Sequence, residues 1–503
     1  MCGIFFVKSK NIIDKLSFEK SLHAMDFRGP DDSSVLYIDD NKTGFGHLRL
    51  QIIGDQIDGS QPMVSHNDRY IIIFNGEIYN YKLLSKQFFA GANFKSDTRL
   101  LIELFTLLGD SFVDHLEGMF AFVIYDKVAD SWFAYRDRFG IKPLFYYQDS
   151  NMTILSSEII SFKYFVELEV DSDSLIEWKK FRRCCPNHTF YKNIFEVLPG
   201  YYKTERAHKA WYYLIPSDSD FCLETSLNEV ITDHLCSDVD VTCLLSGGVD
   251  SSIIAKLTNL KYHYTVGLPE INEFDDVKEF CDYTNKFSYY IDLNSNDLFK
   301  IWREMSSRRL EPLSVPNEAL IYHVCKSMPS NTKVVLSGEG ADEIMFGYDR
   351  IFGYMNDQKN IDLSGFLNMY SYSSIQPTDR ILDYINDLSF NKSPIEFCED
   401  FFLFFHLPGL LRRVDFSMML ASKEGRVPFV DRRIIEPLYR KSYETKNVNG
   451  ISKSLLKDIL NNNGLNFVSK RNKIGFTTKS TSEDTNKYYE DFQKIMLKEL
   501  KWS

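Results

Sequence analysis

Residues 244–252 read LLSGGVDSS, and this stretch decides the fold of the second half of the chain. It follows an apolar run that starts at Val239 and precedes a stretch with helical spacing, from Ser252 to Leu260. The glycines let backbone N–H groups approach an anion, and the start of the predicted helix faces the same point. The pattern predicts a strand, a phosphate-binding turn and a helix; an ordinary capped glycine turn is the alternative. No Gly-Lys-Ser/Thr follows, so the turn is not a Walker A loop.

A second glycine turn, SGEGADE at residues 337–343, ends a later predicted strand that begins at Lys333. Ligands of open parallel sheets bind at the carboxyl ends of strands, so the two turns are expected to meet over one nucleotide. The three acids of this turn would repel one another, which argues for a nearby cation. Asp250 in the first turn is unsuited to bare phosphate but suits Mg²⁺ on a polyphosphate. A solvated acidic turn is the alternative.

The predicted elements divide the chain into two domains. From about 239 to 336 strands and helices alternate, which predicts an α/β doubly wound parallel sheet, and beyond about 350 the chain is mostly helical. Before about 200, apolar runs such as YIIIF (70–74) and FAFVIY (120–125) surround one helical stretch from Thr98 to Leu108, which predicts a layered sheet domain. We therefore place domains at 1–205 and 226–503, joined by a polar linker at 206–225.

Composition excludes several classes of protein. The 503 residues include 58 basic and 70 acidic side chains, a net charge of −12, which disfavours a general nucleic-acid binder. Nine cysteines are too sparse for a disulfide scaffold, and no stretch approaches the ~18 apolar residues that a membrane span requires. The N-terminus lacks the features of a signal peptide. We expect a cytoplasmic protein that binds no membrane.

Cys2 is the first candidate nucleophile. If Met1 is removed, the thiol and the free α-amine share one residue, and the amine can act as the base for the thiol. This is the N-terminal nucleophile arrangement. A cysteine at position 2 is by itself weak evidence for it.

Other residues of the first half suit a glutamine-like substrate. Asn75 and Gly76 follow a predicted buried strand, where a side-chain amide and a backbone N–H can form an oxyanion hole. Arg49 can bind a carboxylate in bidentate fashion, and Glu77 and Asp97 can hold an ammonium group. Taken singly, each has a plainer structural explanation, such as a turn for Asn-Gly and a surface position for the arginine.

Together these motifs resemble the glutamine-dependent asparagine synthetase family, whose first domain is a class II amidotransferase, over nearly the whole chain. The motifs of the first domain are MCGI (1–4), RGPD (28–31), HLRL (47–50), NGEIYN (75–80), SDT (96–98), LEGMFA (116–121), RDRFGIKPL (136–144) and LPG (198–200). Those of the second are the two glycine turns, GRVPFVD (425–431) and KIGF (473–476).

The resemblance implies a fold and the roles of the first site. The first domain would be an α+β N-terminal-nucleophile hydrolase sandwich with four layers, αββα. The second would be a PP-loop domain, related to adenine nucleotide α-hydrolases, with an ammonia tunnel between the sites. Cys2 would attack the glutamine amide, Asn75 and Gly76 would form the oxyanion hole, and Arg49, Glu77 and Asp97, with Asn75, would bind glutamine.

For the second site the resemblance implies ATP and Mg²⁺. Glu339 and Asp342 would lie at the reacting centre, and Lys453 would neutralise charge in the transition state. Mg²⁺ would be held by Asp250, Asp342 and an acid at 275 or 276, of which we favour Asp275. The ATP-binding residues would be Leu244, Ser246, Gly247, Gly248, Asp250, Ser251, Ser252, Val266, Ser337 and Gly338.

The implied reaction makes asparagine from aspartate, glutamine and ATP, and the family also implies a homodimer. The acceptor is the open question, because residues 311–324 contain no arginine for an aspartate carboxylate. Arg308 and Arg309 precede this segment and are candidates for the role. The first alternative is the same chemistry on another carboxylate, such as a uronic sugar of a surface polysaccharide. The second is a non-catalytic regulator that binds nucleotide or glutamine. A β-lactam-forming relative is disfavoured because such enzymes usually lack Cys2.

Overall fold

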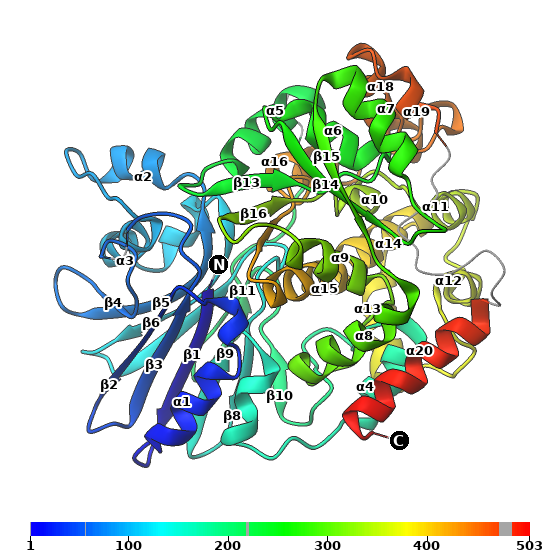
Figure 1. Ribbon diagram of the computed structural model, residues 1–503. Coiled ribbons are helices and arrows are strands. Elements are labelled where there is room, and N and C mark those ends of the chain that lie inside the picture. Colours follow the sequence, from blue (N-terminus) through cyan, green and yellow to red (C-terminus); the bar gives the residue numbers. More distant parts are fainter. Residues whose placement is uncertain (1, 56, 218–220, 472–484, 503) are drawn as a thin grey trace.

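Two antiparallel sheets of six strands each form the centre of the N-terminal domain in the computed structural model (Figure 1). Their strand orders are β10-β8-β9-β1-β3-β2 and β12-β11-β7-β6-β5-β4. The strands are β1 (Cys2–Ser9), β2 (Asp32–Ile38), β3 (Thr43–Arg49), β4 (Met63–Val64), β5 (Tyr70–Ile78), β6 (Gly118–Asp126), β7 (Ser131–Arg136), β8 (Phe145–Gln148), β9 (Met152–Ser156), β10 (Ile194–Glu196), β11 (Tyr201–Lys203) and β12 (His208–Ala210). The structure describes residues 2–55, 57–217, 221–471 and 485–502, so Met1 and the KIGF motif lie outside it.

The side chains of β1 point alternately to its two faces, and their surroundings show how the two sheets are layered. Ile4 and Phe6 belong to a buried cluster that includes Ile73 and Val123 of the other sheet, so they lie between the sheets. Successive side chains of a strand point to opposite faces, and Phe5 accordingly packs on the outer face, against α1. The two sheets therefore face each other across an apolar layer.

Helices cover the outer faces. They are α1 (Lys15–His23), which packs on the first sheet, α3 (Asp97–Leu108), which packs on β5, and α2 (Tyr81–Phe88), which packs on α3; α4 (Ser172–Phe181) lies against the C-terminal domain, where its Glu177 pairs with Arg380. The side chain of Ser96 caps α3 by accepting the N–H of Arg99. The layers are helix, sheet, sheet and helix, which confirms the predicted sandwich and the predicted helix from Thr98 to Leu108.

A parallel sheet forms the core of the C-terminal domain. Its strands are β13 (Asp240–Cys243), β14 (Tyr262–Gly267), β15 (Phe287–Asp292), β16 (Thr332–Leu336) and β17 (Glu424–Arg426). Parallel ladders join β13-β16-β17 and β14-β15, and a parallel bridge between Leu244 and Tyr264 connects the two groups. The order β15-β14-β13-β16-β17 places the first strand, β13, in the middle. This is the doubly wound arrangement that the alternation predicted.

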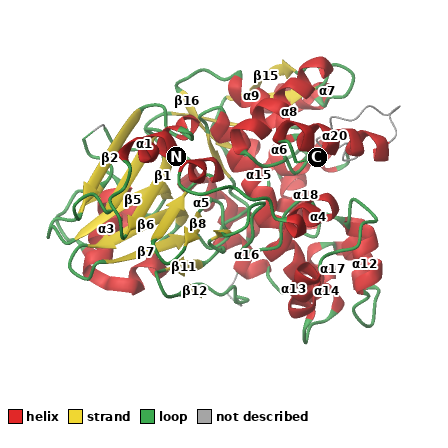
Figure 2. Cartoon of the chain, turned by 90° about the horizontal axis from the view of Figure 1, so that it is seen from below, coloured by secondary structure: helices red, strands yellow, loops and turns green. Residues whose placement is uncertain are grey.

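Helices make up the rest of the C-terminal domain, and Figure 2 shows them massed on the side away from the two antiparallel sheets. Those that accompany the parallel sheet are α5 (Leu223–His234), α6 (Val249–Leu257), α7 (Phe274–Thr284), α8 (Ser295–Arg309) and α9 (Glu318–Lys326). The later ones are α10 (Ala341–Ile344), α11 (Asp349–Asn356), α12 (Leu363–Tyr370), α13 (Asp379–Ser389), α14 (Pro394–Asp400), α15 (Leu407–Leu420), α16 (Arg432–Leu438), α17 (Tyr443–Lys446), α18 (Ser454–Asn462), α19 (Asn466–Ser469) and α20 (Thr485–Leu500). One apolar cluster runs through both domains, so they share a core.

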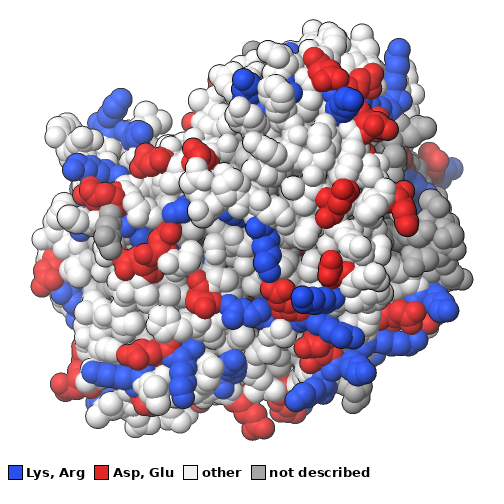
Figure 3. All heavy atoms as spheres, viewed as in Figure 1, with Lys and Arg blue, Asp and Glu red and all other residues white. Residues whose placement is uncertain are grey.

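The segment at 206–225 contains regular structure. β12 pairs with β11 of the second antiparallel sheet, and α5 begins inside the same segment. On the face drawn in Figure 3, acidic and basic side chains are interspersed. Within the described ranges, no helix has both the length and the hydropathy of a membrane span.

Candidate active sites

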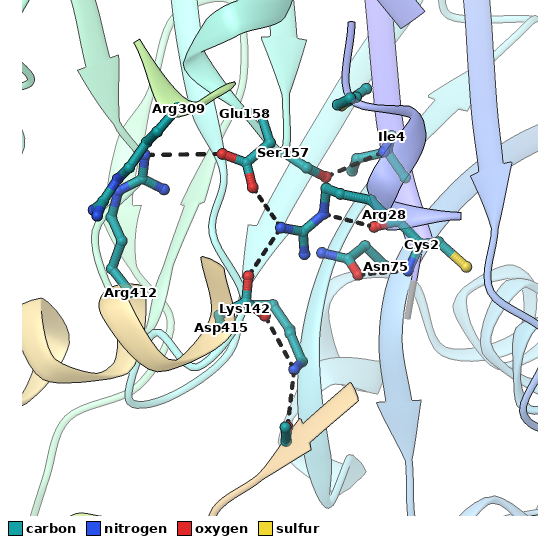
Figure 4. Close-up of polar contacts among 12 residues, drawn as sticks. Cys2, Ile4, Arg28, Asn75, Lys142, Ser157, Glu158, Arg309, Arg412 and Asp415 are labelled. Carbon is teal, nitrogen blue, oxygen red and sulfur yellow. Dashed lines mark hydrogen bonds and ion pairs between the residues drawn. The ribbon is translucent and has the colours of Figure 1, made fainter. Parts of the chain in front are cut away.

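Cys2 lies at the start of β1, opposite Arg49 of β3, and its side chain is buried. Its backbone N–H donates to Asn75 Oδ1 at 3.0 Å, and its carbonyl accepts from Arg28 Nε at 3.1 Å (Figure 4). Burial raises the pKa of the Cys2 thiol, although the positive charge of Arg49 opposes the shift. The resting thiol is therefore neutral and needs a base before it can act as a nucleophile.

Asn75 and Gly76 lie on β5, which packs against β1, the strand that carries Cys2. The Asn75 side chain is completely buried, and its Nδ2 has no hydrogen-bond partner among the residues that the structure describes. A buried amide N–H₂ without a partner is costly, which suggests a role in binding a ligand. A Cβ on Gly76 would come within 2.1 Å of the Met119 carbonyl oxygen, so only glycine fits this close strand pairing. The predicted oxyanion-hole residues are thus brought together beside Cys2.

The Arg49 side chain, which we predicted to bind a substrate carboxylate, binds backbone carbonyl groups of the protein in this structure. Its guanidinium donates to the carbonyl groups of Ile53, Gly54 and Asp55 at 3.1, 3.2 and 2.8 Å. The side chain is buried, and it holds the loop after β3 against the site. A role in binding a substrate carboxylate stays a prediction.

Glu77 and Asp97 form a buried acidic pair. Arg426 Nη2 lies 3.5 Å from Glu77 Oε2, whereas Glu77 Oε1 has no hydrogen-bond partner within the described part of the chain. Asp97 accepts from the N–H groups of Ile78 and Thr98. Burial raises the pKa of Asp97 to about 6, and burial together with the Asp97 charge raises the pKa of Glu77. Arg426 lies near Glu77 but is itself paired with Glu424 at 2.6 Å, so the buried carboxylates of Glu77 and Asp97 suit an added ammonium group.

The second site is a cavity of about 490 Å³ where the glycine turns of the parallel sheet meet. It is large enough for a nucleotide. Most residues predicted for this site line it: Leu244, Ser246, Gly247, Gly248, Asp250, Ser251, Val266, Ser337, Gly338, Glu339, Asp342 and Lys453. Ser252 does not, because it is buried within α6, and Asp276 lines the wall where we favoured Asp275.

The two turns are in direct contact. A Cβ on Gly338 would lie 2.9 Å from the backbone nitrogen of Ser251 and 3.0 Å from atoms of Asp250. Gly247 has a φ of +71°, and a Cβ there would lie 3.0 Å from the Cβ of Asp276. Glycine at 338 therefore lets the two turns meet, as predicted, and glycine at 247 lets the first turn approach α7.

Lys453 joins the two turns. Its Nζ lies 2.6 Å from Asp250 Oδ2 and 2.5 Å from Asp342 Oδ1, and the residue is buried. Although burial opposes the shift, the two carboxylates raise the pKa of Lys453, so it remains charged. The cation that the acidic turns require is supplied here by the protein itself.

Other residues of the cavity wall carry no motif and were not predicted. Among them are Tyr348, Arg413, Lys457 and Arg471. Arg471 donates to the Gly247 carbonyl at 3.1 Å and pairs with Asp276 at 3.2 Å. An isolated arginine far along the chain offers no local signal, so only the fold reveals these positions.

The two arginines proposed for the acceptor lie elsewhere. Arg308 pairs with Asp26 at the surface, and Arg309 pairs with Glu311 and Glu318 at 3.2 Å each. Neither lines the cavity. The prediction that they bind the acceptor is therefore wrong for this arrangement of side chains, because carboxylates of the chain already hold both.

A buried charge network joins the two domains beneath Cys2 (Figure 4). Arg28 Nη1 lies 2.5 Å from Glu158 and 2.9 Å from Asp415 of α15. Lys142 lies 3.4 Å from the other oxygen of Asp415. Arg412, also on α15, lies 4.0 Å from Glu158 and pairs with Glu311. The network ties the Cys2 carbonyl, through Arg28, to α15 of the C-terminal domain.

Comparisons with known proteins agree with this geometry. A family model for a glutamine amidotransferase domain matches residues 1–213, and one for asparagine synthase matches residues 223–501. Asparagine synthetase [glutamine-hydrolyzing] 3 of Bacillus subtilis is 28% identical, with 92% of this chain and 84% of the relative covered. Asparagine synthetase [glutamine-hydrolyzing] 1 of the same organism is 30% identical, with coverages of 69% and 59%. A probable asparagine synthetase [glutamine-hydrolyzing] of Acanthamoeba polyphaga mimivirus is 28% identical, with coverages of 98% and 88%.

Proposed function

Because the chain belongs to the asparagine synthase family and is a glutamine-dependent amide-forming synthetase, we propose that it converts L-aspartate, L-glutamine and ATP to L-asparagine, L-glutamate, AMP and diphosphate. The observation that carries the synthetase half is Lys453 held between Asp250 and Asp342, where the two glycine turns meet. The glutaminase half is supported by Asn75, whose Oδ1 accepts from the Cys2 N–H while its Nδ2 has no hydrogen-bond partner among the described residues.

In the first site the Cys2 sulfur attacks the side-chain carbonyl carbon of glutamine. The developing oxyanion accepts hydrogen bonds from Asn75 Nδ2 and the N–H of Gly76, which are in place before the reaction. Ammonia leaves, and water then hydrolyses the γ-glutamyl thioester to glutamate. Glu77 and Asp97 bind the α-ammonium group of the substrate.

In the second site an oxygen of the acceptor carboxylate attacks the α-phosphorus of ATP, and diphosphate leaves. The resulting acyl-adenylate has a good leaving group, so ammonia attacks its carbonyl carbon and AMP departs. Lys453 neutralises charge on the phosphates while this occurs. Ammonia passes between the sites inside the protein, which keeps it unprotonated and at high effective concentration.

The donor set fits Mg²⁺ bound together with a polyphosphate. Within the described residues, no three His, Cys, Asp or Glu side chains converge on one point. Mg²⁺ characteristically takes one or two carboxylates plus substrate phosphates, and Asp250 and Asp342 provide two on one wall. Mg²⁺ would neutralise the phosphates of ATP, with Asp276 beside the same turn.

The second candidate function is the same reaction on another carboxylate. It is favoured because Arg308 and Arg309, the candidates for binding an aspartate carboxylate, are already paired with Asp26 and Glu311. The test incubates the protein with glutamine, Mg²⁺-ATP and L-aspartate or D-galacturonate, and measures diphosphate and amide. Diphosphate release with galacturonate alone overturns the aspartate proposal, and no release with any carboxylate favours a regulator.

Asn75→Ala is expected to lower the glutaminase kcat by about 10²–10³-fold, because it removes one oxyanion donor. Glutamate formation from glutamine measures the effect, and ammonia-dependent amide synthesis should persist. Asn80→Ala is the matched control: Asn80 belongs to the same motif, but its Nδ2 binds the His115 carbonyl. Equal losses in the two variants would argue against an oxyanion role.

Glutamine binding is expected to weaken as the pH falls below about 6, by roughly tenfold per unit. Asp97, whose pKa is raised to about 6, is neutral below that pH, and only its ionised form attracts the α-ammonium group. Calorimetry with a Cys2→Ala variant measures affinity without turnover. In Asp97→Asn the profile should move to lower pH, because the Asp97 charge helps to raise the pKa of Glu77. A profile unchanged by Asp97→Asn would refute the assignment.

A further inference from the structure

A second, smaller cavity adjoins the nucleotide cavity. Its volume is about 30 Å³, and it shares Leu410 and Arg413 of α15 with the larger one. The end of α4 contributes Arg182, and Ser314 and Tyr372 lie on the same wall. A space of this size holds about one or two water molecules, so it suits a carboxylate group and is too small for a sugar ring.

Arg182 is a buried cation that forms no ion pair with any residue the structure describes. Its side chain is only 5% exposed, and none of its three guanidinium nitrogens has a hydrogen-bond partner among the described residues. Its carbon Cζ lies 4.7 Å from the ring centroid of Tyr372 and 4.9 Å from that of Tyr489. The two rings lie against the guanidinium group, and the buried N–H groups at its edge bind no described residue.

The neighbouring Arg183 differs from Arg182 because its guanidinium group has partners within the protein. It donates to the carbonyl groups of Cys184 and Phe405, and its Nη2 lies 3.9 Å from Glu196. Burial lowers the pKa of Arg182, and among the described residues only Tyr372 and Tyr489, and no carboxylate, oppose that shift. Burying an unpaired charge destabilises the folded protein, and an anionic ligand would offset that cost.

Arg413 connects this position to the reacting centre. It lines both cavities, and its Nη2 lies 3.9 Å from Glu339 Oε2 in the second glycine turn. Its buried Nε has no hydrogen-bond partner within the described chain. Two arginines with unused N–H donors therefore line one small space beside the nucleotide site.

We propose that Arg182 and Arg413 form a subsite for a second carboxylate of the acceptor, so that the enzyme amidates dicarboxylates. One acceptor carboxylate is adenylated beside Asp342, and the other binds the two guanidinium groups. An ammonium group next to this second carboxylate can pair with Glu339, which favours an amino acid such as aspartate over a uronic sugar. The inference rests on the proposed amide-forming reaction and deepens it.

The kinetic test compares Arg182→Met and Arg413→Met with wild type, using ammonia as the nitrogen donor. The KM for L-aspartate should rise at least tenfold in each variant, while glutaminase activity stays unchanged. For Arg182→Met the KM for ATP should also stay unchanged. Arg350→Met is the control, because Arg350 is exposed on α11 and lines neither cavity. Faster diphosphate release by the wild type with 3-aminopropanoate or D-galacturonate than with L-aspartate overturns the dicarboxylate class.

A binding test separates this proposal from the reaction itself. Succinate should raise the melting temperature of the wild-type chain and not that of Arg182→Met. Without ligand, Arg182→Met should melt no lower than wild type, since a buried unpaired charge is removed. A succinate shift that depends on Arg182, with no amide formed from any carboxylate, would support the subsite and reject the reaction. Amide formation with an unchanged KM in Arg182→Met, or an equal succinate shift in both proteins, would reject the subsite.

Discussion

Cys2→Ala abolishes glutamine-dependent amide synthesis, by on the order of 10⁴-fold or more, and leaves ammonia-dependent synthesis intact. The thiol is the atom proposed to attack glutamine, and no cysteine of the described chain, Cys2 included, lines the proposed nucleotide cavity. Its removal leaves the Lys453 site unchanged, because the side chain of Cys2 makes no contact there. Diphosphate release with glutamine and with ammonium chloride measures the two activities separately.

Cys222→Ala is the matched control for this experiment. Cys222 is exposed and precedes α5, away from both sites, so its variant should keep both activities. The prediction fails if Cys2→Ala loses both activities while its melting temperature and circular dichroism match those of the wild type. Such a result would mean that the two sites are not separable.

Lys453→Met abolishes synthesis with either nitrogen source, by about 10³-fold, and keeps glutaminase activity. The ammonium group lies between Asp250 and Asp342, so its loss leaves two carboxylates facing the phosphates of ATP. The repulsion opposes both ATP binding and the charge that develops at the α-phosphorus. Rates of diphosphate release and of glutamate formation, measured on the same preparation, test both halves of the expectation.

Lys278→Met provides the control, since Lys278 is exposed on α7 and does not line the cavity. Lys453→Arg keeps the charge and should recover part of the activity. Because removing a buried cation can also destabilise the fold, the melting temperature of Lys453→Met must be measured. A folded Lys453→Met variant with wild-type synthesis would remove the central support for the synthetase site.

Local patterns predicted the parts of the molecule that depend on neighbouring residues. The glycine turns at 244–252 and 337–343 specify their own backbone geometry, and parallel strands bring them to one edge. The alternation of apolar residues predicted the layers of both domains. These are the features in which sequence distance and spatial distance agree.

The sequence alone could not predict which of two adjacent helix residues faces the cavity, nor which residues far apart in the chain lie together. α7 begins at Phe274, and one residue along a helix turns a side chain by roughly 100°, so packing against Gly247 decides that Asp276 faces the cavity. Arg182 and Arg413 are far apart in the chain and share a wall only because α4 packs near α15. The hydrogen bonds from Arg49 to the loop after β3 depend on the conformation of that loop, which hydrophobic periodicity does not predict.

The charge network under Cys2 has a consequence for how acceptor preference can diverge or be redesigned. Arg412 and Asp415 fix the axial position of α15 against Arg28 and Glu158, while Arg413 of the same helix lines the proposed acceptor subsite. A shift of this helix would therefore displace Arg28, which binds the Cys2 carbonyl, together with the cavity wall that Arg413 forms. New acceptors are therefore more readily reached by exchanging individual side chains, such as Arg182 or Arg413, than by sliding or re-registering the helix, and libraries for altered specificity should keep α15 in place.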